Sequence, residues 1–545
     1  MVIFNMEGKK DLLRILPIIY SAKKNLFSVL SILSFVTSIA FSQWSYGPDS
    51  SLIVDEYGIY PSGCSDGQGG FYSININVEN PNDRKLNVHR FNKFGFPVWE
   101  EPVSIYSQYN LHEGRVILAN DTGVIVGYAE SEIVGYENNG LPILQLKIVH
   151  QKIDSTGNIM WDPNGVKAGN EDTFSLGYEM VSDNLGGVYS FIILTEDMDS
   201  PTSSVMLQHI SGSGERLLGE SGWVLPGNSS YQKMIKTTDG AIILYFITHG
   251  MGFPVGTFMK IVNDSTVVWE TTLDTAYVHS IIPDNEGGVI ISGKKNSSGY
   301  FPHSSLYNRF YSNRIDNDGN FPWGMSGIML KDSVHRNNGS PHCIFQNNAI
   351  SYFWQDSVNS IENIVTKAID MDGVFLFDSD FIVVNEFPSN KTKFQLISDI
   401  GYNIITWLDD RTGDFNLYSQ AVDVEGNIFW NPDGIHISSI VPELSFVTTI
   451  SDNMGGLISI FEDDYYWVPT YAQHINALGE IGHVLNEGDI NLDGIVNVVD
   501  IVQYVSAILD ETVFPIYEMR FIDLNSDSLI NIVDIVLLVD EILGD

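Results

Sequence analysis

Short runs of alternating hydrophobic and polar residues fill the middle of the chain, and most runs end at a turn rich in Asp, Asn and Gly. In one such run Leu417, Ser419 and Ala421 alternate with Tyr418 and Gln420. A period of two predicts β-strands with two unlike faces. No clear helical period appears between residue 44 and about residue 485. We therefore predict an all-β region there.

Two sequence patterns recur eight times in this region. Copies of the first, an Asp- and Gly-rich turn that opens a β-branched run, begin at Ser65, Asn120, Ser182, Thr238, Pro283, Gln346, Ser398 and Ser451. The second places a glycine four residues before a large aromatic residue, as in Gly95/Trp99, Gly157/Trp161, Gly319/Trp323 and Gly426/Trp430, with weaker copies at Ser265/Trp269, Gly373/Phe377, Gly214/Leu218 and Gly479/His483. Successive members of this second series lie 51 to 62 residues apart.

A unit of about 50 residues holds about four short strands, which is one blade of a β-propeller. The repeats therefore predict a propeller of eight four-stranded blades. Seven blades, if the fourth unit with its degraded turn is not a full blade, and an open β-solenoid are the alternatives. The glycines supply the positive φ of tight turns, and we expect the aromatic residues to pack between neighbouring blades.

The two ends of the repeat region predict closure of the ring. After the last turn the chain reads 480–488 without the expected tryptophan strand, and it then leaves the repeats. The segment that begins at Trp44 resembles the strand that follows Trp430. We expect this N-terminal strand to complete the last blade, because closure removes an exposed edge that would favour aggregation.

The N-terminal residues predict export. Lys23 and Lys24 precede an apolar run at 26–41, and the small residues Ala40 and Ser42 follow in the pattern of a signal peptide cleaved after Ser42. The run is shorter than the roughly 20 residues that span a bilayer, so a retained anchor is the weaker alternative. We expect a secreted protein with no transmembrane segment after cleavage.

Composition limits the partners and the chemistry. The chain has 68 Asp and Glu against 28 Lys and Arg, which excludes nucleic acid and anionic membranes as partners and leaves divalent cations open. Its two cysteines exclude a disulfide scaffold. Glycoside hydrolysis needs two carboxylates in one cleft, but the acidic pairs at 409–410, 462–464 and Glu130/Glu132 are interpreted as solvated turns. No catalytic residue is assigned.

The C-terminal segment contains two twelve-residue loops with oxygen ligands at positions 1, 3, 5, 9 and 12 and a main-chain carbonyl at position 7. The first consists of Asp489, Asn491, Asp493, Ile495, Asn497 and Asp500, and the second of Asp523, Asn525, Asp527, Leu529, Asn531 and Asp534. This is the spacing of an EF-hand calcium loop. Gly494 gives the first loop its sharp bend, Ser528 replaces it in the second, and an apolar helix is predicted after each loop, at 501–509 and 535–543.

Duplicated loop-helix units that close on Asp resemble the type I dockerin domain. The resemblance covers 488–545 and implies two Ca²⁺ ions, calcium-dependent folding, and docking onto a cohesin-like module of a scaffold or cell-surface protein. The partner surface would include Val498, Val499, Ile532 and Val533, a set more apolar than is usual in the family. An alternative is that this surface packs against the propeller.

These observations divide the chain into a signal peptide at 1–42, a β-propeller at 43–485 and a small α-helical dockerin-like domain at 486–545. The favoured hypothesis is a secreted, calcium-binding protein whose tail attaches to a cohesin-type or cell-surface partner while the propeller binds a glycan or a protein. The alternative is a polysaccharide-degrading glycoside hydrolase, or an accessory subunit, of an extracellular complex. That second hypothesis depends on the resemblance of the tail rather than on a site.

Overall fold

The computed structural model describes most of the chain after residue 42. It describes residues 43–545 except 81–83, 120–122, 137–141, 171–173, 196–202, 226–227, 250–254, 275, 297–306, 336–338, 400, 440–446, 463–468, 483–485, 491–495, 510–521, 526, 528 and 544–545. The predicted signal peptide lies outside the described residues. Among the helices that are described, none has both the length and the apolar character needed to cross a bilayer.

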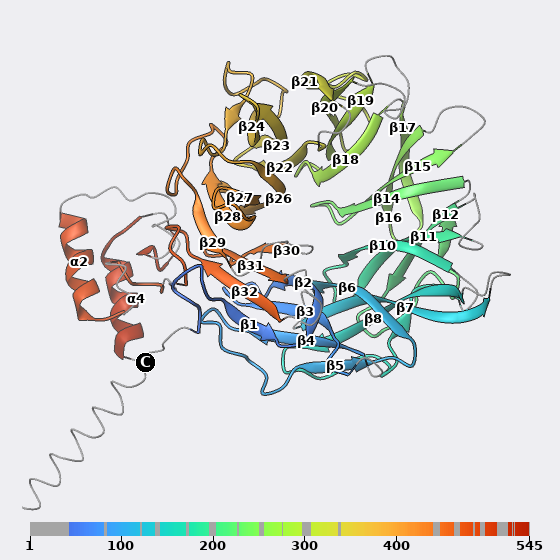
Figure 1. Ribbon diagram of the computed structural model, residues 1–545, viewed down its shortest axis with the longest axis horizontal. Helices are drawn as coiled ribbons and strands as arrows, with labels where there is room; N and C mark the ends of the chain where they lie inside the picture. The colour runs from blue at the N-terminus through green and yellow to red at the C-terminus, as the bar shows by residue number, and fades with distance from the viewer. Residues whose placement is uncertain are drawn as a thin grey trace, which may run out of the picture. The chain divides into compact units, whose positions relative to one another are not determined.

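The described strands form eight four-stranded antiparallel sheets, which are the blades of a β-propeller (Figure 1). Blade 1 consists of β2 (Gly58–Ser65), β3 (Phe71–Asn77), β4 (Lys85–Phe91) and β5 (Val103–Tyr106), and blade 2 of β6 (Asn110–Leu118), β7 (Gly123–Tyr136), β8 (Pro142–Asp154) and β9 (Val166–Lys167). Blade 3 consists of β10 (Phe174–Ser182), β11 (Val188–Thr195), β12 (Ser203–Ile210) and β13 (Trp223–Leu225), and blade 4 of β14 (Asn228–Lys236), β15 (Ile242–His249), β16 (Val255–Val262) and β17 (Thr266–Asp274).

The second half of the ring repeats this arrangement. Blade 5 consists of β18 (Ala276–Pro283), β19 (Val289–Asn296), β20 (Tyr307–Ile315) and β21 (Ile328–His335), and blade 6 of β22 (His342–Gln346), β23 (Ala349–Val358), β24 (Ile361–Asp370) and β25 (Ile382–Val383). Blade 7 consists of β26 (Lys391–Asp399), β27 (Tyr402–Asp409), β28 (Asn416–Val422) and β29 (Ile435–Ser438), and blade 8 of β30 (Val447–Ser451), β31 (Leu457–Glu462), β32 (Thr470–Ile475) and β1 (Leu52–Asp55).

Blade 8 confirms the predicted closure. Strand β1 pairs antiparallel with β32, with Leu52 opposite Ala472 and Ile53 opposite Tyr471, so the first strand of the chain is the outermost strand of the last blade. The eight-blade prediction is therefore confirmed, and the seven-blade and open-solenoid alternatives are wrong. Because the first strand of the chain completes the last blade, the two ends of the propeller region close the ring.

Tryptophans bind neighbouring blades together, as the repeat predicted. The indole Nε1 of Trp161 donates to the carbonyl of Gly212 in the next blade at 3.0 Å, and Trp430 donates to Ala477 at 3.0 Å. Trp44 occupies the corresponding place for blade 8 and donates to Lys93 at 2.8 Å. The hydrophobic core likewise lies between sheets, because each main cluster draws buried aliphatic side chains from two adjacent blades.

The Asp of the first turn pattern has a second role, which the sequence did not reveal. In blade 5, Asp284 Oδ1 accepts the backbone N–H groups of Glu286 and Gly288 at 2.9 and 2.7 Å, while Oδ2 lies 2.9 Å from Arg314 Nε on the third strand. Blades 1, 3 and 8 repeat this arrangement, with Arg90 in blade 1 and His209 and His474 in blades 3 and 8 as the partner of the carboxylate. Each of these turns is therefore anchored to its own sheet by a contact between the Asp carboxylate and a basic side chain.

The tail contains two described helices, α2 (Val498–Leu509) and α4 (Ile532–Leu543). Both begin three residues before the predicted positions because an asparagine caps each of them: Asn497 Oδ1 accepts the N–H of Val499, and Asn531 Oδ1 accepts that of Val533. An apolar cluster that includes Tyr504, Ile535 and Leu538 forms the core of this part of the chain. A complete all-α domain stays a prediction.

Candidate functional site

The innermost strand of most blades departs from regular pairing. Strands β2, β6, β10, β14, β18, β22, β26 and β30 lie nearest the centre of the ring (Figure 1), and neighbouring members contact one another around it. Six of these eight strands, all except β22 and β30, show a shift of register consistent with a β-bulge. A bulge inserts a residue into the strand and turns a side chain out of the regular alternation.

Three bulge residues adopt the left-handed backbone conformation, although none of them is a glycine. They are Tyr60 with φ of 54°, Tyr231 with φ of 55° and Lys393 with φ of 49°. Each lies six residues before an equivalent turn residue (Asp66, Thr237 and Asp399, respectively). A strained backbone that recurs at one place in the repeat is typical of functional positions.

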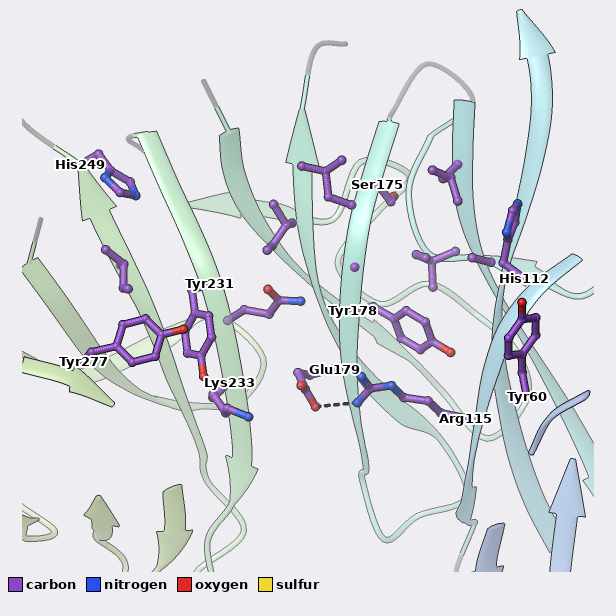
Figure 2. A pocket seen from close by; sticks show the side chains of 18 residues that line it. Tyr60, His112, Arg115, Ser175, Tyr178, Glu179, Tyr231, Lys233, His249 and Tyr277 are labelled. Atoms are coloured by element: carbon purple, nitrogen blue, oxygen red, sulfur yellow. Dashed lines mark hydrogen bonds and ion pairs between the residues drawn. The ribbon is translucent and has the colours of Figure 1, made fainter. Parts of the chain in front are cut away.

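A cleft of about 910 Å³ lies against the inner strands of blades 1 to 5. We call it the inner cleft and define it by the polar side chains that line it, which are Tyr60, His112, Arg115, Tyr178, Glu179, Tyr231, Lys233, His249 and Tyr277 (Figure 2). Aliphatic side chains of the second and third strands form much of the remaining wall. A concave site with a few convergent polar groups is the usual form of a ligand site.

Tyrosine rings are the largest side chains of the inner cleft. Tyr231 and Tyr277, from adjacent blades, lie with ring centroids 4.9 Å apart and are only partly buried. Burial, followed by the neighbouring tyrosines, raises the pKa of Tyr231 well above its usual value. The Tyr178 hydroxyl donates to the carbonyl of Gly127 at 2.6 Å, which fixes the ring in the wall. These tyrosines combine an apolar ring face with a hydroxyl group.

Charged side chains project between the tyrosines (Figure 2). Arg115 Nη1 lies 3.0 Å from Glu179 Oε2, and its guanidinium lies 5.5 Å from the ring centre of Tyr178. Lys233 lies with its Nζ 5.9 Å from the ring centre of Tyr231. Among the described lining residues Glu179 is the single carboxylate, and it pairs with Arg115 rather than with Lys233. The lining therefore carries a net positive charge.

Two histidines meet beside the inner cleft. His279 Nε2 on β18 and His342 Nε2 on β22 are 3.2 Å apart, and the ring of His342 also packs against Phe394 at 4.9 Å. Burial, with a smaller contribution from positive charges that include Lys233, lowers the pKa of both histidines to about 4. Both imidazoles are consequently neutral at neutral pH.

The acidic pairs that the sequence interpreted as solvated turns do not line this cleft, and the interpretation is wrong for several of them. Glu130, Asp409 and Glu462 are buried rather than solvated. Asp409 Oδ2 pairs with Arg411 at 2.7 Å, and Glu462 accepts the N–H of Tyr60 at 2.6 Å. These carboxylates therefore hold the fold, and Glu462 supports the bulge at Tyr60.

The sequence reasoning missed the lining of the inner cleft. Alternation of hydrophobic and polar residues continues through a bulge with a shift of one residue, so the pattern conceals which side chain faces the centre. One signal was available in β2, because Pro61 follows Tyr60 inside a strand. A proline in a strand is confined to edges and bulges.

The tail places only part of the predicted calcium ligands within the described residues. Asn491, Asp493 and Ile495 of the first loop lie outside them. Of the described ligands, Asp489 and Asp500 are buried. No group of three or more His, Cys, Asp or Glu side chains converges on a metal position among the residues that the structure describes. The calcium sites therefore stay a prediction.

The second loop is described more fully, and its donors fit a hard cation. Asp523 Oδ1 accepts the N–H of Asp527 at 3.1 Å, which gives the segment a tight curl. Asp534 is buried, with Oδ1 accepting the N–H of Leu524 at 2.9 Å and Oδ2 accepting that of Asn531 at 2.8 Å. The side-chain donors are all oxygen, which Ca²⁺ prefers. A Ca²⁺ ion held by these residues would supply the positive charge that offsets their carboxylates.

The predicted partner residues of the tail are exposed. Val498 and Ile532 are each 65% exposed, and Val499 and Val533 are 49% and 46% exposed. These four side chains occupy equivalent positions in the two loop-helix units. A partner-binding surface and packing against the propeller both stay predictions for these residues.

Comparisons with known proteins show no family for this chain. No family model matches the sequence, and no curated protein matches it. Solved structures that share the propeller region include the polysaccharide lyase Uly1 (11% identity, 79% of this chain and 91% of that chain, TM-score 0.39). They also include a Penicillium chrysogenum α-L-arabinanase complexed with arabinobiose (9% identity, 61% of this chain and 99% of that chain, TM-score 0.31). A third is NanB (12% identity, 81% of this chain and 71% of that chain, TM-score 0.27).

Glycoside hydrolases and a polysaccharide lyase are thus among the structural neighbours of the propeller. The identities lie between 8% and 12% and all the TM-scores are below 0.5. Similarity at this level transfers no activity, because one fold carries many unrelated functions.

Proposed function

We propose that the propeller binds a glycan in the inner cleft. The observation that carries the proposal is the set of partly exposed tyrosine rings at an open cleft, Tyr60, Tyr231 and Tyr277, of which the first two lie in bulges. A pyranose or furanose ring has an apolar C–H face that packs on an aromatic ring and hydroxyls that bond to polar groups. Tyrosine offers both features in one side chain.

Polar groups around the tyrosines suit the rim of a sugar. His112 Nε2 lies 2.8 Å from the hydroxyl of Ser131, which orients the imidazole beside Tyr60. Gln232 and His249 add further amide and imidazole groups to the lining. A cleft with aromatic platforms and hydrogen-bonding groups fixed in its wall would hold an oligosaccharide without the reorganisation that a flexible surface would need.

Binding fits the inner cleft better than hydrolysis by a carboxylate pair. Such hydrolysis needs two carboxyl groups roughly 5 to 9.5 Å apart, whereas Glu179 is the single carboxylate of the described lining. Its Oε2 is paired with Arg115 at 3.0 Å, so the carboxylate is engaged within the wall of the cleft. Hydrolytic or eliminative release of products from a polysaccharide would establish the enzymatic alternative.

The test is calorimetric titration of the full chain with a panel of oligosaccharides. Tyr231→Ala and Tyr277→Ala are expected to weaken binding of the positive ligand about tenfold each, because each removes a stacking face. Tyr106→Ala is the matched control, since Tyr106 on the outermost strand of blade 1 is 59% exposed and lies outside the cleft. Binding that none of the three variants changes would contradict the proposal.

We also propose that the tail is a calcium-dependent docking module that binds a cohesin-like partner. Two observations support it: an Asp closes each helix cap, with Asn497 N–H bonded to Asp500 and Asn531 N–H bonded to Asp534, both at 2.8 Å, and the apolar residues after each cap are exposed. A signal peptide at the N-terminus would place this module outside the cell, where millimolar calcium is available.

Calcium titration of the full chain tests this second proposal. We expect two binding events with a gain of helical circular dichroism, and the loss of one event in each of Asp500→Ala and Asp534→Ala. Asp318→Asn is the control, because Asp318 is an exposed turn residue of the propeller. A chain that binds no calcium, or that has the full helical signal without it, would refute the proposal. If calcium does bind, we expect Val499→Asp to abolish binding to a purified cohesin module that the parent chain binds.

A further inference from the structure

The inner cleft is positively charged in a strongly acidic protein. The chain has a formal net charge of −40, but its described cleft lining contains Arg115 and Lys233 against the single carboxylate of Glu179. A local field of opposite sign to the whole molecule concentrates ligands of the opposite charge at that place. A positive lining in an otherwise acidic chain therefore indicates an anionic ligand.

Lys233 is the centre of this positive field. It lies on the inner strand β14, two residues after the strained bulge at Tyr231, and it is half buried. No described carboxylate forms an ion pair with it, whereas Lys147, Lys260 and Lys331 in the same propeller each pair with an Asp or Glu. A half-buried ammonium group without a counter-ion costs solvation energy, which a bound anion would restore.

The histidines near Lys233 add no negative charge that would compensate it. His279 and His342 both experience the charge of Lys233, and the pKa of each is lowered, first by burial, to about 4. Lys294 acts on His279 in the same direction. On the other side of the cleft, the charge of Arg115 is cancelled by Glu179 at 3.0 Å. The groups that face Lys233 are therefore neutral or cationic, with Glu179 as the single described acid of the lining.

We propose that the inner cleft is specific for an acidic glycan, a saccharide carrying carboxylate or sulfate groups, and that Lys233 binds the anionic group. The inference rests on the proposed glycan binding and adds the charge of the ligand. In this arrangement Tyr231 and Tyr277 carry a sugar ring while the ammonium group of Lys233 meets its acidic substituent. Glu179 screens Arg115 and so limits the affinity for a second negative charge.

The experiment titrates the full chain with an oligogalacturonate, a sulfated oligosaccharide and a neutral oligosaccharide of the same length. We expect an acidic ligand to bind, with an affinity that falls as salt rises, and the arm that binds identifies the carboxylate or the sulfate. Lys233→Met should lower that affinity by about tenfold or more, and Lys233→Arg should retain most of it. Glu179→Gln should raise it several-fold.

Arg309→Gln is the matched control. Arg309 lies on the third strand of blade 5 and forms an exposed ion pair with Asp332 on the fourth strand, and neither residue belongs to the cleft lining. This substitution removes one positive charge and should leave the affinity unchanged. Circular dichroism tests whether Lys233→Met is folded. If that variant does not fold, the affinity of Lys233→Arg still tests the role of the positive charge.

The outcomes separate the two levels of inference. Equal binding of neutral and acidic ligands, with Lys233→Met changing neither, would refute specificity for acidic glycans while glycan binding stands. Acidic binding that Lys233→Met leaves intact would refute the assignment to Lys233. Absence of binding to every saccharide in the panels would refute the proposed function itself, and the inference with it.

Discussion

His150 in blade 2 makes the stability of the propeller depend on acid. Its side chain is fully buried on β8, and neither ring nitrogen has a partner in hydrogen-bond geometry among the described residues. The ring of Tyr178 lies 6.1 Å away at a tilt, so the histidine fills space between blades 2 and 3. Burial lowers the pKa of His150 to about 4, against a smaller opposing effect of the Val149 backbone.

The size of the effect follows from proton linkage. The unfolded chain takes up a proton at His150 as pH falls below about 6.5, whereas the folded protein stays neutral there until about pH 4. The unfolded state therefore binds more protons in this window, and stability that is complete above pH 6.5 is lost as pH falls. The loss amounts to about 2 kcal/mol at pH 5 and approaches about 3.4 kcal/mol well below pH 4.

Replacing His150 with leucine tests this reasoning, because leucine has a similar volume and does not titrate. We expect His150→Leu to be as stable as the parent chain or slightly more stable at pH 7.5, since it removes two unbonded polar nitrogens. Between pH 7.5 and pH 5 the parent chain should lose about 2 kcal/mol more than the variant. The assay is urea unfolding followed by tryptophan fluorescence at both pH values.

His249→Leu serves as the control for this measurement. His249 is exposed at the end of β15, so its replacement should leave the pH dependence as in the parent chain. The buried pair His279 and His342 titrates in all three proteins and cancels from the difference. Parallel losses of stability in the parent and His150→Leu would show that the folded protein protonates His150, and the reasoning from burial would fail.

Three further predictions concern the elements that hold the ring. Trp44→Ala should destabilise the chain by about 3 to 5 kcal/mol in urea unfolding, because Trp44 is 2% exposed in blade 8, whereas Tyr46→Ala, 58% exposed, should change stability by less than about 0.5 kcal/mol. Asp284→Asn keeps the backbone hydrogen bonds of its turn but leaves Arg314 without its buried partner, and should cost about 3 kcal/mol in the same assay. Gly479→Ala should lower the melting temperature, since Gly479 has φ of 79° and its added Cβ would lie 2.8 Å from a tryptophan ring.

The sequence contained enough to predict the ring but not the site. Blade number followed from the spacing of Gly95/Trp99 and its copies, because each tryptophan must reach the next blade and so repeats once per blade. Closure followed from Trp44, which has the surroundings of the missing last tryptophan. Such features are local in the sequence and repeated. They are therefore visible without knowledge of which strands lie side by side.

The inner cleft depends on the opposite kind of information. Tyr60, Arg115 and Lys233 come from three blades, and they share a cleft only because of how far each strand is bulged. The bulge shifts register by an amount that the partner strand and neighbouring blades decide, so alternation alone cannot give it. The buried carboxylate of Glu462 shows this dependence: it bonds the N–H of Tyr60, a residue 402 positions away in the chain, and the turn-like sequence around it predicted solvent instead.

This contrast also indicates how the fold accommodates a site. The tryptophans act between sheets and the turn aspartates act within them, and both recur from blade to blade. Each inner strand pairs with its own sheet on one edge only, so a register shift there leaves the indole hydrogen bonds between blades intact. Differences between repeats can therefore accumulate at the centre at little cost in stability. An irregular, charged and aromatic lining in otherwise regular blades is the physical reason to look for the ligand at the inner cleft.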